Sequence, residues 1–414
     1  MAESSGWCEP GVDQALLWLA IDDRKGNPKR KHMLPQAIYT QRIAPFLRFV
    51  DPLPNQLYAV GGRNQQQGPL NTVEMFDSWH GCWVSCPSMS ARRAGCAAVV
   101  LPDHRMLVIG GYDENGIVKG LLSSCEAYDP STQQWDSNTR NLSRARWGHG
   151  CACLNGLVYV IGGCSLRPGA PTRESFMETL RSCEIYDAST NTWRESADLQ
   201  MARAGSRVVA VGSRHLAAVG GCDDVFGRAE MLPTVELYDV AAGRWSLLDT
   251  QLSTPRTTAA VAALDDRTIL VVGGAPSLSS IEVFTIPDKK DEKEREHTEQ
   301  QGSTHPLQDV SEGRMGCQAV GMLLPGSANN YPLCTRPCVV VVGGENGDED
   351  MESTGQGRQF STALVYDVEK GDWSPDISFP AMQTPRTAMA LCVGYGKIRG
   401  HPCADRAVIP RGGA

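Results

Sequence analysis

The sequence predicts an all-β fold, a six-bladed β-propeller in which every blade is a sheet of four short antiparallel strands. Two recurring patterns predict it. An apolar, β-rich run ends in a Gly-Gly pair six times, with the first glycine at Gly61, Gly110, Gly162, Gly220, Gly273 and Gly343. In the same phase, an aspartate stands six residues before a tryptophan five times, as Asp77–Trp83, Asp129–Trp135, Asp187–Trp193, Asp239–Trp245 and Asp367–Trp373. A spacing of 49 to 70 residues between successive units is enough for the four strands of one blade.

Each unit supplies its strands in a fixed order. The run before Gly-Gly forms one strand, and the Glu-x-Tyr segment before the aspartate forms another, as in Glu126 to Tyr128. Turn-forming residues fill the gap before the tryptophan, so a tight hairpin leads into a strand that the tryptophan starts. The fourth strand follows an arginine, in the segments 92–101, 146–154, 203–211, 256–264, 314–323 and 386–393. The unit after Gly273 lacks the tryptophan and is expected to be degenerate.

Three segments fall outside the repeat. Residues 1–50 are expected to form a short α-helical extension, because 12–23 and 34–47 have helical apolar spacing. Residues 288–305 are almost entirely charged or polar, which predicts a solvated loop, with a partner-binding or modified segment as the alternative. Residues 397–414 form a tail, which leaves 51–396 for the propeller.

The composition narrows the functional classes. The formal net charge of −8 over 414 residues argues against nucleic-acid binding through bulk charge. No run of about 20 apolar residues spans a membrane and no signal peptide is recognised, so no membrane partner is expected. The 15 cysteines are odd in number, and many stand in strand-like runs where a free thiol behaves as a small hydrophobe. The expected location is the cytoplasm, with the nucleus as the alternative.

Residues 55–396 resemble the Kelch-repeat proteins, because Gly-Gly, Tyr-Asp and Trp recur in phase with arginine-led strands. In that family the C-terminal strand completes the first blade, which implies that 386–393 pairs beside 55–62 and closes the circle. Segment 12–47 is similar to the end of a BACK domain, as in the BTB-BACK-Kelch ubiquitin-ligase adaptors. The BTB domain and most of the BACK domain are missing here, so a link to a cullin ligase is expected only if a BTB domain lies upstream.

Glutamates and arginines recur with the same period. A glutamate precedes the aromatic residue by two positions in five units, at Glu74, Glu126, Glu184, Glu236 and Glu282. A buried carboxylate is costly unless it is paired, and the arginines that lead the fourth strands are the obvious partners. Recurrence favours a structural role for the glutamates, because a catalytic acid is needed once. Two roles remain open for the arginines: structural pairing, or a ring of guanidinium groups that binds an acidic peptide.

The resemblance implies a partner-binding mouth at one end of the propeller. In Kelch-like adaptors, the residues at and after the leading arginine and the residue after Gly-Gly line this mouth. The candidate partner-binding residues are Arg63, Arg93, Tyr112, Arg146, Trp147, Arg203, Arg256, Arg314, Glu345 and Arg386. The unequal loops 164–181, 222–233 and 345–361 are expected to supply specificity on the same face.

Motifs for catalysis, metal binding or cofactor binding are poorly supported. The pairs Cys82/Cys86 and Cys334/Cys338 lack the second ligand pair of a zinc site, and His149 is the one histidine beside an arginine-led strand. No nucleophile elbow, phosphate loop or HExxH-type signature occurs. The prediction is a non-enzymatic protein-interaction module without metal or cofactor, resembling the substrate-recognition part of a cullin-type E3 ubiquitin-ligase adaptor that takes part in protein ubiquitination. The alternative is an actin-binding or cytoskeletal scaffold.

Overall fold

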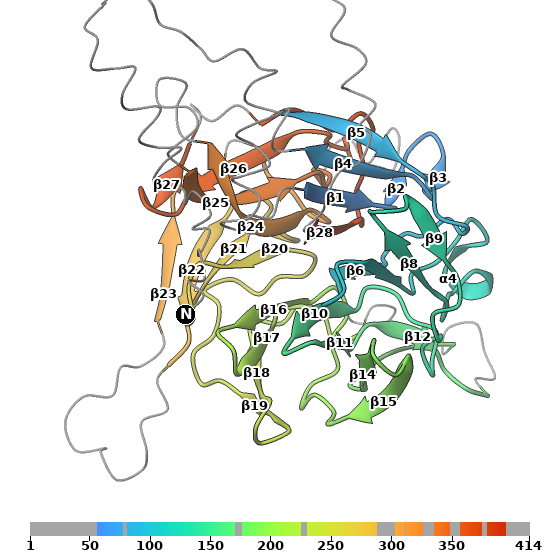
Figure 1. Cartoon of the computed structure of the whole chain (residues 1–414). Coiled ribbons are helices and arrows are strands. Elements are labelled where there is room, and N and C mark those ends of the chain that lie inside the picture. The colour runs from blue at the N-terminus through green and yellow to red at the C-terminus, as the bar shows by residue number, and fades with distance from the viewer. Residues whose placement is uncertain are drawn as a thin grey trace, which may run out of the picture. The chain divides into compact units, whose positions relative to one another are not determined.

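The computed structural model describes residues 56–77, 81–169, 176–224, 230–287, 303–310, 312–325, 335–347, 357–374 and 379–394. These residues contain six four-stranded antiparallel sheets, the blades, arranged in a circle (Figure 1). The expected extension 1–50 and tail 397–414 lie outside the described residues, as does 288–302. Among the described helices, none is long and apolar enough to cross a membrane.

The blades are numbered along the chain, and each is given from its innermost to its outermost strand. Blade 1 contains β28 (Ala390–Gly394), β1 (Gln56–Val60), β4 (Val73–Asp77) and β5 (Cys82–Cys86). Blade 2 contains β6 (Ala97–Val100), β7 (Met106–Ile109), β8 (Cys125–Asp129) and β9 (Gln134–Asp136). Blade 3 contains β10 (Gly150–Leu154), β11 (Leu157–Ile161), β14 (Cys183–Asp187) and β15 (Thr192–Ser196).

The second half of the chain repeats the order. Blade 4 contains β16 (Arg207–Val211), β17 (His215–Val219), β18 (Val235–Asp239) and β19 (Arg244–Leu247). Blade 5 contains β20 (Ala260–Ala263), β21 (Thr268–Val272), β22 (Ile281–Thr285) and β23 (Ser303–Leu307). Blade 6 contains β24 (Gln318–Pro325), β25 (Thr335–Val342), β26 (Ala363–Asp367) and β27 (Asp372–Trp373).

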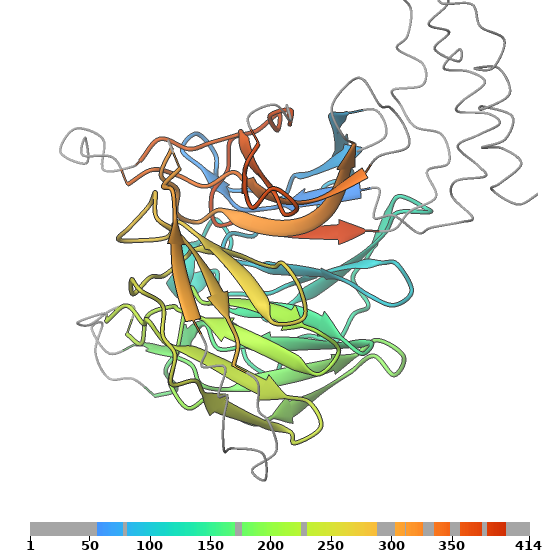
Figure 2. The same ribbon diagram turned by 90° about the vertical axis from the view of Figure 1, so that its left-hand side faces the viewer.

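The circle closes through the two ends of the repeat. The inner strands β28, β6, β10, β16, β20 and β24 neighbour one another in this order around the axis. β28 pairs antiparallel with β1, with Val60 opposite Ala390, so the C-terminal strand completes blade 1. Two short hairpins, β2–β3 (Arg63–Asn64 and Gly68–Pro69) and β12–β13 (Cys164–Leu166 and Met177–Thr179), extend from one end of blades 1 and 3. Figure 2 shows the twist of the sheets from the side.

Blade 5 differs from the sequence prediction. Its outer strand β23 begins at Ser303, so the last residues of the expected loop 288–305 belong to a strand that pairs with β22. The short helix α4 (Gly116–Lys119) in blade 2 was not expected either.

The Gly-Gly pairs are required by the backbone. Gly110 and Gly111 have φ angles of +59° and +93°, a backbone region that residues other than glycine rarely adopt. A Cβ atom on Gly110 would lie 2.6 Å from the carbonyl oxygen of Arg146, and one on Gly111 would lie 2.8 Å from that of Ala94. Each pair thus ends the second strand of its blade where two neighbouring chain segments cross closely.

The core lies between adjacent blades. In one cluster, Leu107 and Ile109 of blade 2 pack with Val158 and Val160 of blade 3, and these side chains are completely buried. Apolar residues occur in unbroken runs in these strands, because both faces of a blade are covered by its neighbours. The periodic tryptophan joins blades as well: Trp135 of blade 2 donates its indole N–H to the carbonyl of Pro87 at 2.8 Å, in the segment that leaves blade 1.

Candidate functional site

The six arginines that lead the inner strands are buried and bind main-chain oxygens. Arg93 donates from Nη1 to the carbonyls of Gly110 (3.0 Å) and Ser124 (2.8 Å), at the ends of two adjacent strands of its blade. The same pair of contacts recurs as Arg146 with Gly162 and Ser182, Arg203 with Gly220 and Thr234, Arg256 with Gly273 and Ser280, Arg314 with Gly343 and Thr362, and Arg386 with Gly61 and Thr72. None of the six is more than 1% exposed.

The periodic glutamates pair with these arginines in five blades, which confirms the pairing hypothesis. The Nη2–Oε1 distances are 2.9 Å for Arg93–Glu126, 2.6 Å for Arg146–Glu184, 2.7 Å for Arg203–Glu236, 2.7 Å for Arg256–Glu282 and 2.5 Å for Arg386–Glu74. Each glutamate also accepts a main-chain N–H of the segment that crosses from the preceding blade, as Glu126 does from Ser90 at 2.8 Å. Burial by itself would raise the pKa of Glu126, but the Ser90 N–H and the charge of Arg93 outweigh it and hold this pKa below its usual value.

This burial corrects the expectation of a guanidinium ring at the surface. Arg93, Arg146, Arg203, Arg256, Arg314 and Arg386 point into their own blades, because the carbonyls around each Gly-Gly pair and the buried carboxylate hold the guanidinium there. Of the two alternatives for these residues, structural pairing is the one that the geometry supports. The remaining candidates, Arg63, Tyr112, Trp147 and Glu345, are outside this buried network.

The mouth, defined as the end of the propeller that carries the arginine-led turns and the residues after Gly-Gly, has a regular frame. In every blade the residue after the arginine forms an isolated β-bridge with the residue after Gly-Gly. The six bridges are Arg63 with Thr387, Ala94 with Tyr112, Trp147 with Cys164, Ala204 with Cys222, Thr257 with Ala275, and Met315 with Glu345. The two sets of positions that the family resemblance implied therefore lie side by side.

A closed ring of main-chain hydrogen bonds surrounds the axis next to this frame. The N–H of Gly95 donates to Ala388, whose N–H donates to Gly316, and the series continues around all six blades at 2.8 to 3.0 Å. The axial ring consists of Gly95, Gly148, Gly205, Thr258, Gly316 and Ala388, all with positive φ. Sequence analysis missed it, although a glycine two positions after the arginine in four of the six units was an available signal.

Four predicted residues from four blades meet on one side of the mouth. Arg63 of blade 1 pairs with Glu345 of blade 6 at 2.9 Å. Tyr112 of blade 2 and Trp147 of blade 3 stand edge to face with ring centroids 5.8 Å apart. Burial raises the pKa of Tyr112, while the charge of Arg63 acts in the opposite direction and that of Glu345 adds to the rise, so the phenol lies within range of this ion pair. Arg63, Tyr112, Trp147 and Glu345 are called the mouth cluster below.

The mouth cluster combines an exposed cation with an aromatic pair. The side chain of Arg63 is 37% exposed, whereas that of Glu345 is 9% exposed, so the positive partner of the pair faces outward. Tyr112 and Trp147 are half-buried, and a Cβ atom on Gly95 of the axial ring would lie 3.2 Å from the Trp147 ring. Tyrosine, tryptophan and arginine are the residue types that most often dominate protein–protein binding energy.

Two of the loops expected to supply specificity contain described residues that make contacts at this end of the propeller. In blade 3 the hairpin β12–β13 carries Glu178, which pairs with Arg144 and lies 3.7 Å from Arg167. In blade 6 Gln359 accepts from the main-chain N–H of Gln65 in blade 1 at 3.0 Å, which ties the loops of the first and last blades together. Cys164 and Cys222 are buried, and burial raises the pKa of Cys164 to about 12, so these thiols are not poised for reaction.

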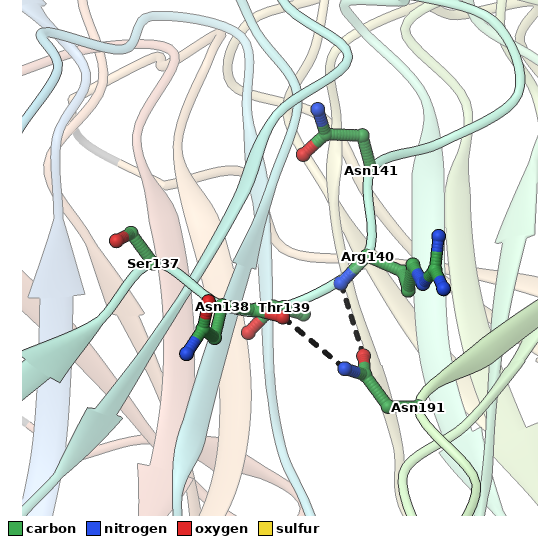
Figure 3. Close-up of a pocket in the computed structure, with 6 residues that line it drawn as sticks. All are labelled: Ser137, Asn138, Thr139, Arg140, Asn141 and Asn191. Atoms are coloured by element: carbon green, nitrogen blue, oxygen red, sulfur yellow. Dashed lines mark hydrogen bonds between the residues drawn. The ribbon is translucent and has the colours of Figure 1, made fainter.

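A hollow lies elsewhere on the described surface, and its lining carries few reactive groups. This open hollow of about 760 Å³ is lined by Ser137, Asn138, Thr139, Arg140, Asn141 and Asn191, which are drawn in Figure 3. Both ends of the Asn191 amide hold the loop, since Nδ2 donates to the Asn138 carbonyl and Oδ1 accepts from the Arg140 N–H. The lining offers no acid, histidine or thiol. Over the described ranges, no three His, Cys, Asp or Glu side chains are grouped as metal ligands.

The chain was compared with known proteins. The family model "KLHDC2/KLHL20/DRC7 Kelch-repeats domain" matches residues 50–274, which is 225 of the 414 residues. A solved structure titled "Structure of YjhT" superposes with a TM-score of 0.53 at 13% identity and covers 74% of this chain and 89% of that one, which shows the fold.

Curated relatives match the same repeats. Mus musculus Kelch-like protein 36 is 28% identical over 223 residues, which are 53% of this chain and 34% of the relative. Homo sapiens Kelch-like protein 34 is 30% identical over 217 residues, 51% of this chain and 30% of the relative. Xenopus tropicalis Kelch-like protein 25 is 26% identical over 283 residues, 68% and 40% respectively. The chain spans less than half of each of these relatives. With the propeller, its Gly-Gly and arginine network and the matched family model, the chain belongs to the Kelch-repeat family.

Proposed function

We propose that the propeller is a non-enzymatic protein-interaction module that binds its partner at the mouth cluster. One observation carries the proposal: Arg63, Tyr112, Trp147 and Glu345 come from four separate blades and converge on one side of the mouth. The repeat does not explain these residues, because the equivalent positions in other blades hold different residue types such as Ala94 and Cys164. A rigid frame that presents variable side chains is typical of a recognition surface.

The partner segment is proposed to carry an acidic side chain. Arg63 has an exposed face, and its own carboxylate partner Glu345 lies nearly buried on the other side. A carboxylate from the partner would complete a charge-assisted hydrogen bond to the free face of this guanidinium. The buried arginines take no part in this contact, so Arg63 is the cation on which the acidic preference rests.

The test is quantitative affinity capture with the full chain and two mouth variants, Arg63→Glu and Trp147→Ala. Arg244→Glu is the matched control, because Arg244 is an exposed arginine on the outer strand β19, away from the mouth. We expect partners that bind the wild type and Arg244→Glu to be recovered about tenfold less with either mouth variant, as for loss of an interface hot spot. Equal recovery by all four proteins would disprove the mouth cluster as the binding site.

The ubiquitin-ligase role is a further part of the proposal, supported by the Kelch-like relatives. We propose that the chain is the recognition part of such an adaptor and works in the cytoplasm or nucleus. The twelve cysteines of the described ranges are free thiols, as suits a reducing compartment. A partner captured through the mouth should then be ubiquitinated less in cells that express Trp147→Ala. The actin-binding alternative predicts instead that the chain pellets with F-actin.

A further inference from the structure

A seventh arginine, Arg207, is partly buried next to the axis and does not belong to the repeat. It opens the inner strand β16, four positions after Arg203 and two after Gly205 of the axial ring. The equivalent positions of the other inner strands are occupied by Ala97, Gly150, Ala260, Gln318 and Ala390. Small residues at four of these five positions leave room around the axis that Arg207 can fill.

The guanidinium of Arg207 is poorly satisfied. Among the described residues it makes one hydrogen bond, a long one of 3.4 Å from Nη2 to the carbonyl of Cys317, which belongs to blade 6, two blades further along the circle. Its Nε is buried and has no hydrogen-bond partner among the described residues, and none of the ion pairs found between described residues includes Arg207. By contrast, Arg203 in the same strand region binds two carbonyls, a hydroxyl and a carboxylate.

A buried histidine, His149, lies within electrostatic range of Arg207. His149 of blade 3 is 3% exposed, and neither ring nitrogen has a partner in the described part of the chain. Burial lowers its pKa to about 3, with further contributions from the charges of Arg146 and Arg207, so the ring is neutral and carries one N–H. Gln318 of blade 6 donates to the carbonyl of Met389 in the neighbouring blade 1 at 2.9 Å.

We propose that the central channel binds a small inorganic anion, such as chloride or phosphate, at the guanidinium of Arg207. Arg207 is partly buried and its Nε is shielded from water, so its charge is costly without a counter-charge, and a bound anion supplies that charge. The axial ring of six hydrogen-bonded residues stands between this site and the mouth cluster, which favours a diffusible ion over a side chain of a mouth-bound partner. This inference is independent of the proposed function at the mouth.

The experiment measures thermal unfolding of the full chain while sodium chloride or sodium phosphate replaces sodium gluconate at constant ionic strength. We expect the wild-type midpoint to rise by roughly 2–4 °C once the anion exceeds its dissociation constant about tenfold. Arg207→Ala should lose this rise, and it should fold, because alanine is the natural residue at the equivalent positions 97, 260 and 390. Arg244→Ala is the control and should keep the full rise.

A second measurement does not depend on any variant. Crystals of the wild-type chain soaked in sodium bromide should show an anomalous peak within hydrogen-bonding distance of the Arg207 guanidinium. Water without a bromide peak at this place would overturn the proposal, because the guanidinium would then simply be hydrated. An equal chloride- or phosphate-dependent rise in Arg207→Ala would overturn it too, since the effect would come from the general surface.

Discussion

Blade 4 and blade 6 surround the same kind of buried arginine with different side chains. In blade 4, Arg203 pairs with Glu236, whose side chain is completely buried. In blade 6, the position of that glutamate is taken by Leu364, and Arg314 pairs instead with Glu312, whose side chain is 44% exposed. Arg314 also stacks on the ring of Phe360, with its Cζ 4.4 Å from the ring centroid.

What the two blades share shows which part of the network is indispensable. In both, the arginine donates to the carbonyl of the first glycine and to the carbonyl of the threonine that precedes the third strand. The buried carboxylate differs between the blades, so the main-chain contacts define the blade and the acid neutralises the charge. In blade 6 the partly exposed acid supplies the negative charge, and the ring of Phe360 adds a cation–π contact.

The largest expected effect is the loss of the buried acid in blade 4. Glu236→Leu copies the residue of blade 6 and leaves Arg203 charged, buried and without a carboxylate. Breaking a buried ion pair from one side typically costs about 3–5 kcal/mol. The Gln200 and Met201 main-chain N–H groups that Glu236 accepts would lose their partner as well. Chemical denaturation followed by circular dichroism measures the change in the free energy of unfolding.

The matched change in blade 6 is Glu312→Leu. Water can replace a carboxylate that is 44% exposed, and Phe360 still covers one face of Arg314, so the expected cost is about 1 kcal/mol or less. If Glu312→Leu destabilised the chain as much as Glu236→Leu, the proposed difference between the two blades would be wrong.

The axial ring has a glycine in both blades, Gly205 in blade 4 and Gly316 in blade 6. Gly205 and Gly316 have φ angles of +64° and +66°, and a Cβ atom on them would lie 2.3 Å and 2.2 Å from the hydroxyls of Thr257 and Thr387. Gly205→Ala and Gly316→Ala should therefore each cost about 2–3 kcal/mol, from the left-handed backbone and the clash together. The same denaturation experiment compares the two values.

A second substitution separates these two causes in blade 4. Thr257→Ala removes the hydroxyl that the new Cβ atom meets. The double variant Gly205→Ala/Thr257→Ala should therefore lose the part of the cost that comes from the clash and keep about 1–2 kcal/mol from the backbone. Clearly unequal costs for Gly205→Ala and Gly316→Ala would show that the ring is not equivalent around the axis.

The sequence predicted the scaffold better than the surface. The repeat predicted all four strands of a blade. The cost of burying a lone carboxylate predicted ion pairs such as Arg93–Glu126. The same reasoning left open whether these arginines faced outward. Their direction depends on the carbonyls that each Gly-Gly pair exposes, which is a property of the folded backbone.

Residues that break the repeat were the hardest to interpret. Thr258 and Ala388 interrupt the glycine pattern of the axial ring, so the pattern is hard to see in the sequence. Arg207 has no counterpart in the other units. The convergence of Arg63 with Glu345 depends on the closure of blade 1 against blade 6, which brings together residues 282 positions apart. Periodicity identifies what all blades need, whereas a site is built from what only some blades have.

A small expected effect concerns the indole hydrogen bond between blades. Trp245 of blade 4 donates Nε1 to the carbonyl of Ala197 at 3.1 Å, in the segment that leaves blade 3. In blade 6 the Nε1 of Trp373 is buried and has no partner among the described residues. Trp245→Phe should cost about 1 kcal/mol more than Trp373→Phe, because both lose similar packing but only the first loses a hydrogen bond.

The comparison of the two phenylalanine variants is informative because it removes the packing term. Both tryptophans stand next to the tyrosine of their hairpin, with ring centroids 5.1 Å apart in blade 4 and 5.6 Å apart in blade 6. A phenylalanine keeps an aromatic neighbour for that tyrosine in both blades. Denaturation midpoints measured side by side test the difference, and equal destabilisation would mean that the indole bond adds nothing to the cohesion of blades 3 and 4. In that case the exception of blade 6 would be confined to its exposed acid.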